Sequence, residues 1–331
     1  MTSDLDSAAP VDGSKGHNEV PGSCTTTHRQ LTLASDLASS LSFFRQSRLL
    51  PSEANNSMNR QQIPVQKVSY DPTQTYISFV TSDGDNLAYD YGATRDLMAA
   101  RVALCAAANA TAKDCPPVSW TLSPRLPEIA PAWIEWYYSM ARATMADSFL
   151  FGPSGFGYLY PAQLTSDDRR AFTALTIAAA ENMDVSALVE SENCCGGKHA
   201  TSAYVAARMD EYRLYNGSKI RAVFTGNMPA QLVGTTALIS EPVRGYDPYA
   251  SVPLNASAAV ASLDALPRGT TTQMVVIVNP AQAAQLVAVS RGVADHVHLV
   301  GHRELAELQR QKMGWRTRAA TRGLAAMEGS L

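Results

Sequence analysis

Charge is scarce in this sequence, and long apolar runs are absent. Charged side chains make up 17% of the 331 residues, with 27 basic and 30 acidic groups and a formal net charge of -3. Average soluble chains carry about 25% charged residues. Because Lys and Arg form no basic stripe, nucleic acid is not expected as a partner. Because no stretch of about 18 uninterrupted apolar residues occurs, we expect no integral membrane segment.

Two further absences bear on the class of enzyme. No GxGxxG motif follows the first predicted strand, so a dinucleotide-binding fold has no support. No histidine lies between His28 and His199. A carbohydrate deacetylase barrel needs two histidines soon after its first strand to hold a metal, so this sequence argues against that class. The chain also has no internal repeat at a fixed period.

Cysteine is limited to five residues, an odd number, and two of them are placed to pair. Cys105 and Cys115 are ten positions apart on either side of a predicted turn, a spacing that allows a local disulfide. Asn-x-Ser/Thr sequons begin at Asn55, Asn109, Asn216 and Asn255. Both features suit an oxidising, secretory compartment. Secretion is expected only if a longer N-terminus supplies a signal sequence, so the localisation is left unassigned.

Composition divides the chain into three parts. Residues 1–69 are rich in Ser, Thr, Asn and Gln and are predicted to be mostly disordered, with one amphipathic helix at Leu31–Phe44. Residues 70–312 have the pattern of a barrel-like domain, described next. Residues 313–331 form a basic, Ala-rich tail, predicted to be a solvated terminal segment.

From Tyr70 onward, short β-branched or aromatic runs alternate with helix-length stretches, which is the pattern of βα units in a mainly parallel sheet. The predicted strands are Tyr76–Val80, Val118–Leu122, Ser148–Phe151, Val185–Val189, Ile220–Thr225, Thr236–Ile239, Met274–Val278 and Val297–Val300. The predicted helices are Ala88–Ala108, Pro127–Ala146, Ala162–Asn182, Ala200–Tyr215, Ala256–Leu266, Pro280–Ser290 and Glu304–Lys312. Seven or eight units in roughly 240 residues fit an α/β, TIM-like (β/α) barrel with irregular members, and one connection, between the fifth and sixth strands, is poorly helical.

Polar residues follow the predicted strands, whereas the segments before the strands carry few. In a barrel of this class, active-site groups project from the C-terminal ends of the strands. The first strand is followed by Ser82-Asp83-Gly84-Asp85-Asn86, in which two carboxylates flank a glycine and could turn inward together. Such a pair could bind a divalent cation or grip sugar hydroxyls, and the alternative is an Asp-Gly turn that caps the following helix.

The segment after the third strand is rich in glycine and tyrosine. Gly155-Phe156-Gly157-Tyr158-Leu159-Tyr160-Pro161 combines close backbone approach at two glycines with two rings that end in hydroxyl groups. Such rings suit carbohydrate, which has apolar faces and hydroxyl rims. The alternative is a structural loop whose tyrosines plug the top of the barrel.

These seven residues match the signature of the GxGYxYP family of putative glycoside hydrolases without a mismatch, and the chain resembles this family over about residues 70–310. The flanking motifs are similar too: Phe79–Asn86, Trp120–Pro124, Glu128–Pro131 and Trp136–Tyr138. The resemblance implies the barrel-like C-terminal domain of the family and an activity on carbohydrate. It does not assign catalytic residues. The domain that usually precedes this one is expected to be absent, with the polar first 70 residues in its place.

Glycoside hydrolysis is the leading hypothesis, and it requires one protonated carboxyl and one ionised carboxylate. The candidate catalytic residues are Asp83, Asp85, Glu190, Glu192 and Glu241. The candidate substrate-binding residues are Asn86, Ser123, Gly155, Gly157, Tyr158, Tyr160, Asn227 and Asn279. The sequence alone does not distinguish the acid from the nucleophile or base.

Two alternatives remain open. Metal-dependent carbohydrate chemistry would place a divalent cation at Asp83 and Asp85, which also spell the DxD of metal-using glycosyltransferases; no other metal site and no cofactor is expected. A non-catalytic or degenerate barrel would bind carbohydrate without turnover. In each case the expected partner is a carbohydrate, and the oligomeric state is not determined by the sequence.

Several other residues are given structural roles. The aromatic residues on the helix after the second strand have helical spacing and are expected to pack against the barrel. Asp147 precedes the third strand, so it is expected at the end opposite the site. His302 follows the last strand and is expected to close the ring of polar groups. Cys194, Cys195 and His199 lack the usual spacing of a zinc site.

Overall fold

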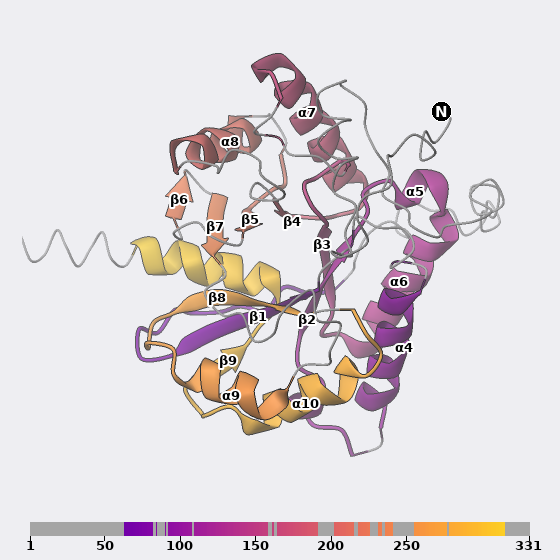
Figure 1. Cartoon of the computed structure of the whole chain (residues 1–331), viewed down its shortest axis with the longest axis vertical. Helices are drawn as coiled ribbons and strands as arrows, with labels where there is room; N and C mark the ends of the chain where they lie inside the picture. The colour runs from indigo at the N-terminus through magenta and orange to yellow at the C-terminus, as the bar shows by residue number, and fades with distance from the viewer. Residues whose placement is uncertain are drawn as a thin grey trace, which may run out of the picture.

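The computed structural model shows a mostly parallel sheet that curves almost into a closed barrel, with helices around its outer side (Figure 1). Its described residues are 63–81, 84, 90, 92–107, 109–157, 161, 164–190, 202–214, 218–225, 231–233, 236–240, 255–276 and 278–314. The predicted α/β barrel is therefore confirmed. Of the sequence predictions, the helix at Leu31–Phe44 and the Cys194, Cys195 and His199 cluster lie outside the described residues.

Nine strands are present in the part of the chain that the structure describes. They are β1 (Thr75–Thr81), β2 (Val118–Leu122), β3 (Ser148–Phe151), β4 (Ala187–Val189), β5 (Ala222–Thr225), β6 (Gln231–Val233), β7 (Thr236–Ser240), β8 (Thr271–Val276) and β9 (Val297–Leu299). The order in the sheet is β6-β7-β5-β4-β3-β2-β1-β8, and β9 pairs with β1. All pairs are parallel except β6 with β7.

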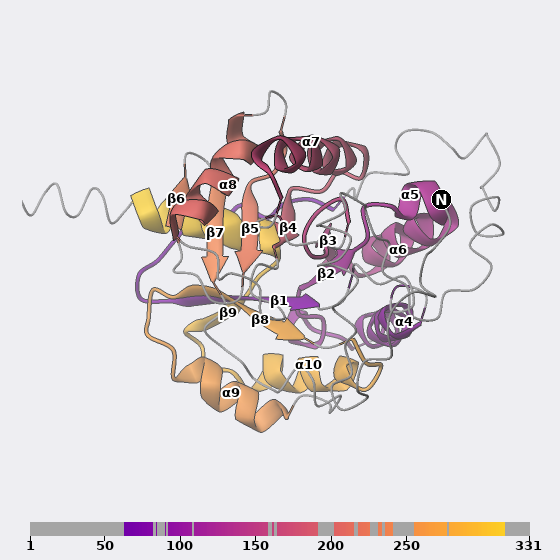
Figure 2. The ribbon, with the colours of Figure 1, turned by 45° about the horizontal axis from the view of Figure 1, so that its top comes forward.

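The helices lie between the strands and cover the outer side of the sheet (Figure 2). They are α4 (Ala93–Cys105), the 3-10 helix η2 (Ala112–Asp114), α5 (Leu126–Ile129), α6 (Pro131–Thr144), α7 (Ser166–Asn182), α8 (Ser202–Leu214), α9 (Ala256–Asp264) and α10 (Gln282–Gly292). A last helix at residues 302–314 follows β9. This order matches the predicted alternation of strands and helices.

The strands alternate between the two sides of the wall, as the period of two residues in a strand requires. In β1, Ile77 and Phe79 belong to the core that packs against the surrounding helices, whereas Tyr76 and Val80 belong to a separate core inside the barrel. All seven residues of β1 are buried. All of these residues except Ser78 are β-branched or aromatic, so the strand is recognisable from its β-branched and aromatic content.

Polar side chains of neighbouring strands pair with one another along one part of the barrel wall. The Ser78 and Ser119 hydroxyl oxygens are 3.0 Å apart, and those of Thr81 and Thr121 are 3.2 Å apart. Across the remaining gap in the wall, Gln273 of β8 donates to the backbone carbonyl of Thr225 at the end of β5, over 3.2 Å. These four hydroxyl groups and the Gln273 amide nitrogen are therefore paired within the wall.

Helix 302–314 closes the barrel at the N-terminal ends of the strands. Its Gln309 accepts a hydrogen bond from Thr271 at the start of β8, and its Gln311 accepts from the Tyr70 backbone over 2.8 Å. Glu304 of the same helix accepts from the backbone of Gln66 over 2.7 Å. Residues 63–70 thus lie along this helix, although the sequence grouped residues 1–69 apart from the barrel; the domain boundaries themselves stay predictions.

Two predicted elements differ in detail. The single predicted helix Pro127–Ala146 is divided into α5 and α6 at Ala130, because Pro131 has no N–H to continue the hydrogen-bond ladder and instead starts α6. The connection predicted to be poorly helical contains β6, which pairs antiparallel with β7. β6 has three residues, too few for a recognisable period, so it could not be predicted from the sequence.

Candidate functional site

The loop after β1 is anchored to the end of β2 through its central glycine. Gly84 donates its N–H to the Thr121 hydroxyl over 3.1 Å, and that hydroxyl also donates to the carbonyl of Thr81 over 2.9 Å. Asp83 and Asp85 are covalently attached on either side of Gly84. The central glycine of the Asp-Gly-Asp segment is therefore held at the C-terminal ends of two neighbouring strands. This is the end of the barrel where the fold places its reactive groups.

Only glycine fits at this position. A Cβ atom added to Gly84 would lie 2.1 Å from the backbone carbon of Thr121 and 2.2 Å from its carbonyl oxygen. Real Cβ atoms do not approach backbone atoms so closely, and a strand backbone has little freedom to move away. The glycine between the two aspartates is thus required by its packing on β2.

We predict that Gly84→Ala destabilises the fold by about 1–3 kcal/mol, the usual cost of an extra methyl group in a site without room. Urea unfolding followed by circular dichroism measures the change. Gly314→Ala is the matched control, because in the described part of the chain a Cβ added there meets nothing within 4 Å apart from its chain neighbours and its own helix backbone. Equal effects of the two substitutions would contradict the packing argument.

The glycine-rich loop after β3 is anchored in a similar way. Gly152 donates its N–H to the carbonyl of Leu122, the last residue of β2, over 3.1 Å. Gly155 has φ +118°, which side chains disfavour, and its neighbour Phe156 donates its N–H to the Thr176 hydroxyl of α7 over 3.1 Å. The first loop therefore begins after β1 and the second after β3, and both are hydrogen-bonded to the end of β2, the strand between them.

Glu190 lies directly after β4 and is held in a buried ion pair. Its carboxylate accepts from Arg208 of α8 over 3.1 Å and from the Tyr212 hydroxyl over 3.4 Å. Arg208 also donates to Glu211 over 2.9 Å, and Glu211 in turn accepts from Arg169 of α7 over 2.7 Å. Two carboxylates and two guanidinium groups thus form one network that joins β4 to α7 and α8.

This network keeps Arg208 charged. Burial by itself would lower the pKa of Arg208, but the negative charge of Glu190, with smaller contributions from Tyr212, Tyr204 and Glu211, outweighs burial and raises that pKa above its ordinary value. The side chains of Glu190 and Arg208 are 4% and 1% exposed. Charges so far from water need each other, because an unpaired buried ion is costly.

Two other predicted contact residues lie at the C-terminal ends of strands, where their side chains shape turns. The Ser123 hydroxyl, after β2, accepts from the backbone N–H of Arg125 over 3.3 Å. The Asn279 side-chain carbonyl, in the turn that leads to α10, accepts from Ala281 over 2.9 Å. Ser123 is buried and Asn279 is half-buried. The predicted residues outside the described part of the chain are Asp83, Asp85, Asn86, Tyr158, Tyr160, Glu192, Asn227 and Glu241.

One buried carboxylate beyond the first loop was missed by sequence reasoning. Asp90 is 1% exposed, and its backbone carbonyl accepts a hydrogen bond from the Tyr137 hydroxyl of α6. Burial, and next the charge of Asp90, raises the pKa of Tyr137 well above its usual range. The sequence, an aspartate between two tyrosines at 89–91, carries no clear signal for this burial, because aspartate is mostly exposed in proteins.

His302 lies at the opposite end of the barrel, which corrects the prediction that it closes the ring of polar groups. β9 pairs with the first half of β1, Thr75 with Val297 and Ile77 with Leu299, so the residues after β9 remain near the base. His302 is fully buried, and its Nδ1 lies 3.0 Å from the hydroxyl of Ser148 at the start of β3. A strand shifted in register cannot be detected from apolar runs alone.

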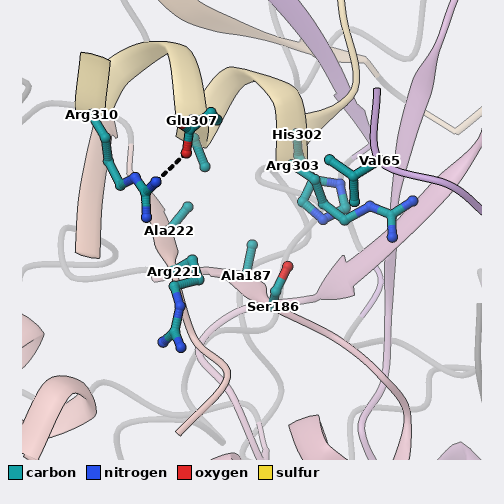
Figure 3. A pocket seen from close by; sticks show the side chains of 10 residues that line it. Val65, Ser186, Ala187, Arg221, Ala222, His302, Arg303, Glu307 and Arg310 are labelled. Carbon is teal, nitrogen blue, oxygen red and sulfur yellow. Dashed lines mark hydrogen bonds and ion pairs between the residues drawn. The ribbon is translucent and has the colours of Figure 1, made fainter. Parts of the chain in front are cut away.

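A pocket of about 250 Å³ lies beside His302 at this base (Figure 3). On one side the pocket is lined by Glu307 and Arg310 of helix 302–314, which form an ion pair with each other. On the other side it is lined by Ala187 and Ala222 at the starts of β4 and β5. Figure 3 shows the guanidinium group of Arg221 pointing away from the helix. Because Ser186 and Arg221 precede β4 and β5, and Ala187 and Ala222 begin these strands, this pocket is at the end opposite the candidate site.

Burial, and to a smaller extent the positive charge of Arg303, lowers the pKa of His302 well below its usual range. In the unfolded chain the pKa returns to about 6.5, so the unfolded state binds one more proton below that pH. We predict that stability is present above about pH 6.5 and is lost below it with a slope of up to about 1.4 kcal/mol per pH unit from this residue.

Urea unfolding between about pH 5 and 7 measures this slope in the protein and in His302→Asn. The variant loses packing at every pH, so the comparison uses the slope and not the absolute stability. A shallower slope in His302→Asn is expected, because asparagine does not titrate in this range. Parallel curves would show that another group controls the pH dependence.

Two other predictions at the base and on the helices are confirmed. Asp147, just before β3, is fully buried and pairs with Arg101 over 2.8 Å, so it belongs to the end opposite the site. Tyr137 and Tyr138 of α6 are buried in the outer core, with Trp133 and Trp136 packed against it. These aromatic side chains support the wall of the barrel.

The family model of the GxGYxYP putative glycoside hydrolase C-terminal domain matches residues 73–284. The chain belongs to this family. The match includes β1 to β8, both anchored loops and Glu190. A search of curated proteins finds no match.

A solved structure of a putative hydrolase from Bacteroides thetaiotaomicron has a similar fold, with a TM-score of 0.67 and 18% sequence identity. The similarity covers 87% of this chain and 54% of that one, so the chain spans about half the length of this hydrolase. At this identity the comparison concerns the fold alone.

Two further solved structures are more distant. Peptidoglycan deacetylase PdaC from Bacillus subtilis has a TM-score of 0.39 and 11% identity, with 76% of this chain and 98% of that one covered. A family 4 carbohydrate esterase from Streptomyces lividans has a TM-score of 0.37 and 11% identity, with 68% and 91% covered. These scores are too low to support any statement about the activity of this chain.

Two kinds of feature are absent from the described residues. No group of three or more His, Cys, Asp or Glu side chains in this part of the chain could hold a metal ion. No helix in the same part is long and apolar enough to cross a membrane.

Proposed function

We propose that this chain hydrolyses a glycosidic bond with a pair of carboxylates at the C-terminal end of the barrel. Membership of the GxGYxYP family supports action on carbohydrate. The observation that carries the proposal is the anchoring of two loops at adjacent strand ends: Gly84 binds Thr121, and Gly152 binds Leu122. One loop supplies carboxylates and the other supplies tyrosine rings.

The spacing of the strands favours cooperation between the two loops. β1, β2 and β3 are consecutive in the sheet, and neighbouring strands lie about 4.8 Å apart. The loops therefore begin about 10 Å apart, a gap that side chains reaching inward from both sides can close. On this basis we place Asp83 and Asp85 within one side-chain length of Tyr158 or Tyr160.

The ion pair at β4 suggests a division of roles. Glycoside hydrolysis needs a protonated carboxyl to donate to the leaving group and an ionised carboxylate as nucleophile or base. Glu190 is paired with Arg208, an arrangement that uses the carboxylate form, so we assign Glu190 to the ionised role. We assign the acid to Asp83 or Asp85, and Glu192 and Glu241 remain alternatives for the ionised role.

The other proposed contacts supply hydrogen bonds and flat apolar faces. The Tyr158 and Tyr160 rings would cover the apolar face of a sugar, with their hydroxyl groups at its rim. Exposed backbone at Gly155 and Gly157 would let the sugar approach closely. The polar side chains assigned to sugar hydroxyls are Asn86, Ser123, Asn227 and Asn279.

Turnover of a panel of aryl glycosides and glycans, with and without EDTA, tests the proposal. Hydrolysis that EDTA does not change is the expected result, because the two carboxylates need no metal. The anomeric form of the first product, followed by NMR, then gives the geometry: retention implies carboxyl groups about 5–5.5 Å apart, and inversion implies about 6.5–9.5 Å. EDTA-sensitive turnover would instead assign a divalent cation to Asp83 and Asp85.

A carbohydrate-binding barrel without turnover is the second candidate. It is favoured by one observation: Glu190, the one candidate catalytic carboxylate among the described residues, is 4% exposed and paired with Arg208, an arrangement that also serves the fold alone. Calorimetric binding of a glycan that the chain does not cleave would support this candidate and reject hydrolysis.

A further inference from the structure

The connection from α4 to β2 is closed by a disulfide. Cys105, the last residue of α4, and Cys115 form a disulfide bond, with Cα atoms 5.0 Å apart and a sequence separation of ten. Disulfides form and persist in secretory and extracellular compartments and are rare in the cytosol. The bond confirms the predicted pairing and indicates an oxidising environment.

The tip of this closed loop carries a glycosylation sequon. Asn109, Ala110 and Thr111 form Asn-Ala-Thr, and the neighbours at 106–108 are all alanine. Asn109 is exposed, and the Ala110 N–H donates to the Ala107 carbonyl over 2.9 Å, which places Asn109 in a tight turn. Among the described residues, no hydrogen bond holds the Asn109 side chain, and no bulky neighbour in sequence covers it.

The rest of the loop is well fixed. Both the N–H and the hydroxyl of Thr111 donate to the Asp114 carboxylate, over 2.8 and 2.9 Å, and Asp114 also pairs with Arg291 of α10. These bonds to the carboxylate lower the pKa of Asp114, with the Thr111 backbone as the largest cause. The asparagine therefore projects from a rigid base.

The loop lies away from the candidate site. It enters β2 at Val118, the N-terminal end of the strand, whereas both anchored loops leave from the C-terminal ends. A bulky modification at Asn109 would occupy solvent beside the base of the barrel and would leave the opposite end open. A glycan at this position would therefore not block access of substrate to the candidate site.

We propose that Asn109 is an N-glycosylation site and that the chain passes through a secretory pathway. The Asn109 Nδ2 atom would form a bond to the anomeric carbon of an oligosaccharide carried on a lipid diphosphate. The bond from that carbon to the diphosphate breaks, the lipid diphosphate leaves, and the amide proton passes to a base of the transferase. The inference is independent of the proposed hydrolase activity.

Asn255, the other sequon residue in the described chain, makes a useful contrast. Its side-chain carbonyl caps α9 by accepting the Ala258 N–H over 3.1 Å. The Asn255 side chain is thus held against a helix, whereas no described bond holds Asn109 at its loop tip. Of these two sequons, we therefore assign the glycan to Asn109.

Peptide mapping of the native protein tests the proposal directly. Trypsin cuts after Arg101, Lys113 and Arg125, so peptides 102–113 and 114–125 stay joined by the disulfide until reduction. Treatment with peptide N-glycosidase F in heavy-oxygen water should convert Asn109 to labelled Asp in the joined pair. Finding peptide 102–113 with intact Asn109 would overturn the site, and free Cys105 thiol as well would overturn the compartment.

Variants expressed in eukaryotic cells give a second readout. Asn109→Gln should increase the gel mobility by the equivalent of one glycan, and unchanged mobility would reject the site. Thr111→Ser is the matched control, because it retains both the sequon and a hydroxyl for Asp114, so its mobility should remain that of the glycosylated protein. Asn255→Asp keeps the cap of α9 and removes that sequon, which separates the two positions.

Discussion

Replacing Asp83 by Asn is expected to lower kcat on a cleaved glycoside by about 10²–10⁴-fold with the melting temperature nearly unchanged. Asparagine has almost the same shape, but it can neither give up a proton nor carry the charge that stabilises the transition state. The result follows from the proposed position of Asp83, beside the anchored Gly84 at the end of β1. Steady-state kinetics together with a thermal melt measure both quantities.

The matched control is Asp295→Asn, an equal change of charge at an exposed residue before β9, far from the strand ends that hold the loops. It should leave both kcat and the melting temperature unchanged. If Asp83→Asn retained activity but melted at a lower temperature, Asp83 would be a turn or capping residue. The same measurement on Asp85→Asn then identifies which aspartate acts.

Arg208→Met is expected to destabilise the fold by about 3–5 kcal/mol, the largest stability effect among these variants. The substitution leaves Glu190 as a buried carboxylate without its cation, and Glu211 loses one of its two. Methionine fills a similar volume, so the loss reports charge rather than an empty space. Chemical denaturation in urea or guanidinium measures it.

Two comparisons sharpen this experiment. Arg170→Met breaks an exposed pair with Asp167, whose side chains are 60% and 87% exposed, and should cost well under about 1 kcal/mol. Adding Glu190→Gln to Arg208→Met should recover part of the loss, because the unpaired charge is removed. A loss of under about 1 kcal/mol in Arg208→Met would mean that water or another cation reaches Glu190.

The two ends of the barrel separate stability from function. At the base, the Arg101–Asp147 ion pair, His302 and helix 302–314 are buried and hold the strand starts together. At the other end, Gly84 and Gly152 anchor the two loops through hydrogen bonds donated by their backbone N–H groups. Substitutions at the base are therefore expected to change stability, whereas those of the loop carboxylates change activity. Gly84 and the Glu190–Arg208 pair, at the same end as the loops, contribute to stability as well.

Much of the fold was predictable because it depends on local pattern. The apolar runs of β1, β2 and β3 are flanked by helix-length stretches, and the predicted bounds of β2 and β3 agree with the structure at every residue. Predictions failed where the signal was short or nonlocal. β6 has three residues, and β9 lies beside the first half of β1 instead of extending the ring.

For the candidate site, the sequence alone determined which chemical groups follow each strand, because in parallel units the residues after a strand must lie at its C-terminal end. It thereby gave the Asp83–Asp85 segment, the Gly155–Pro161 signature and Glu190. Only the tertiary structure decided what those groups touch: Gly84 lies against Thr121, Glu190 pairs with Arg208, and His302 lies at the base. Such contacts join residues 18 to 154 positions apart, and their geometry depends on how the whole sheet curves, which no local pattern records.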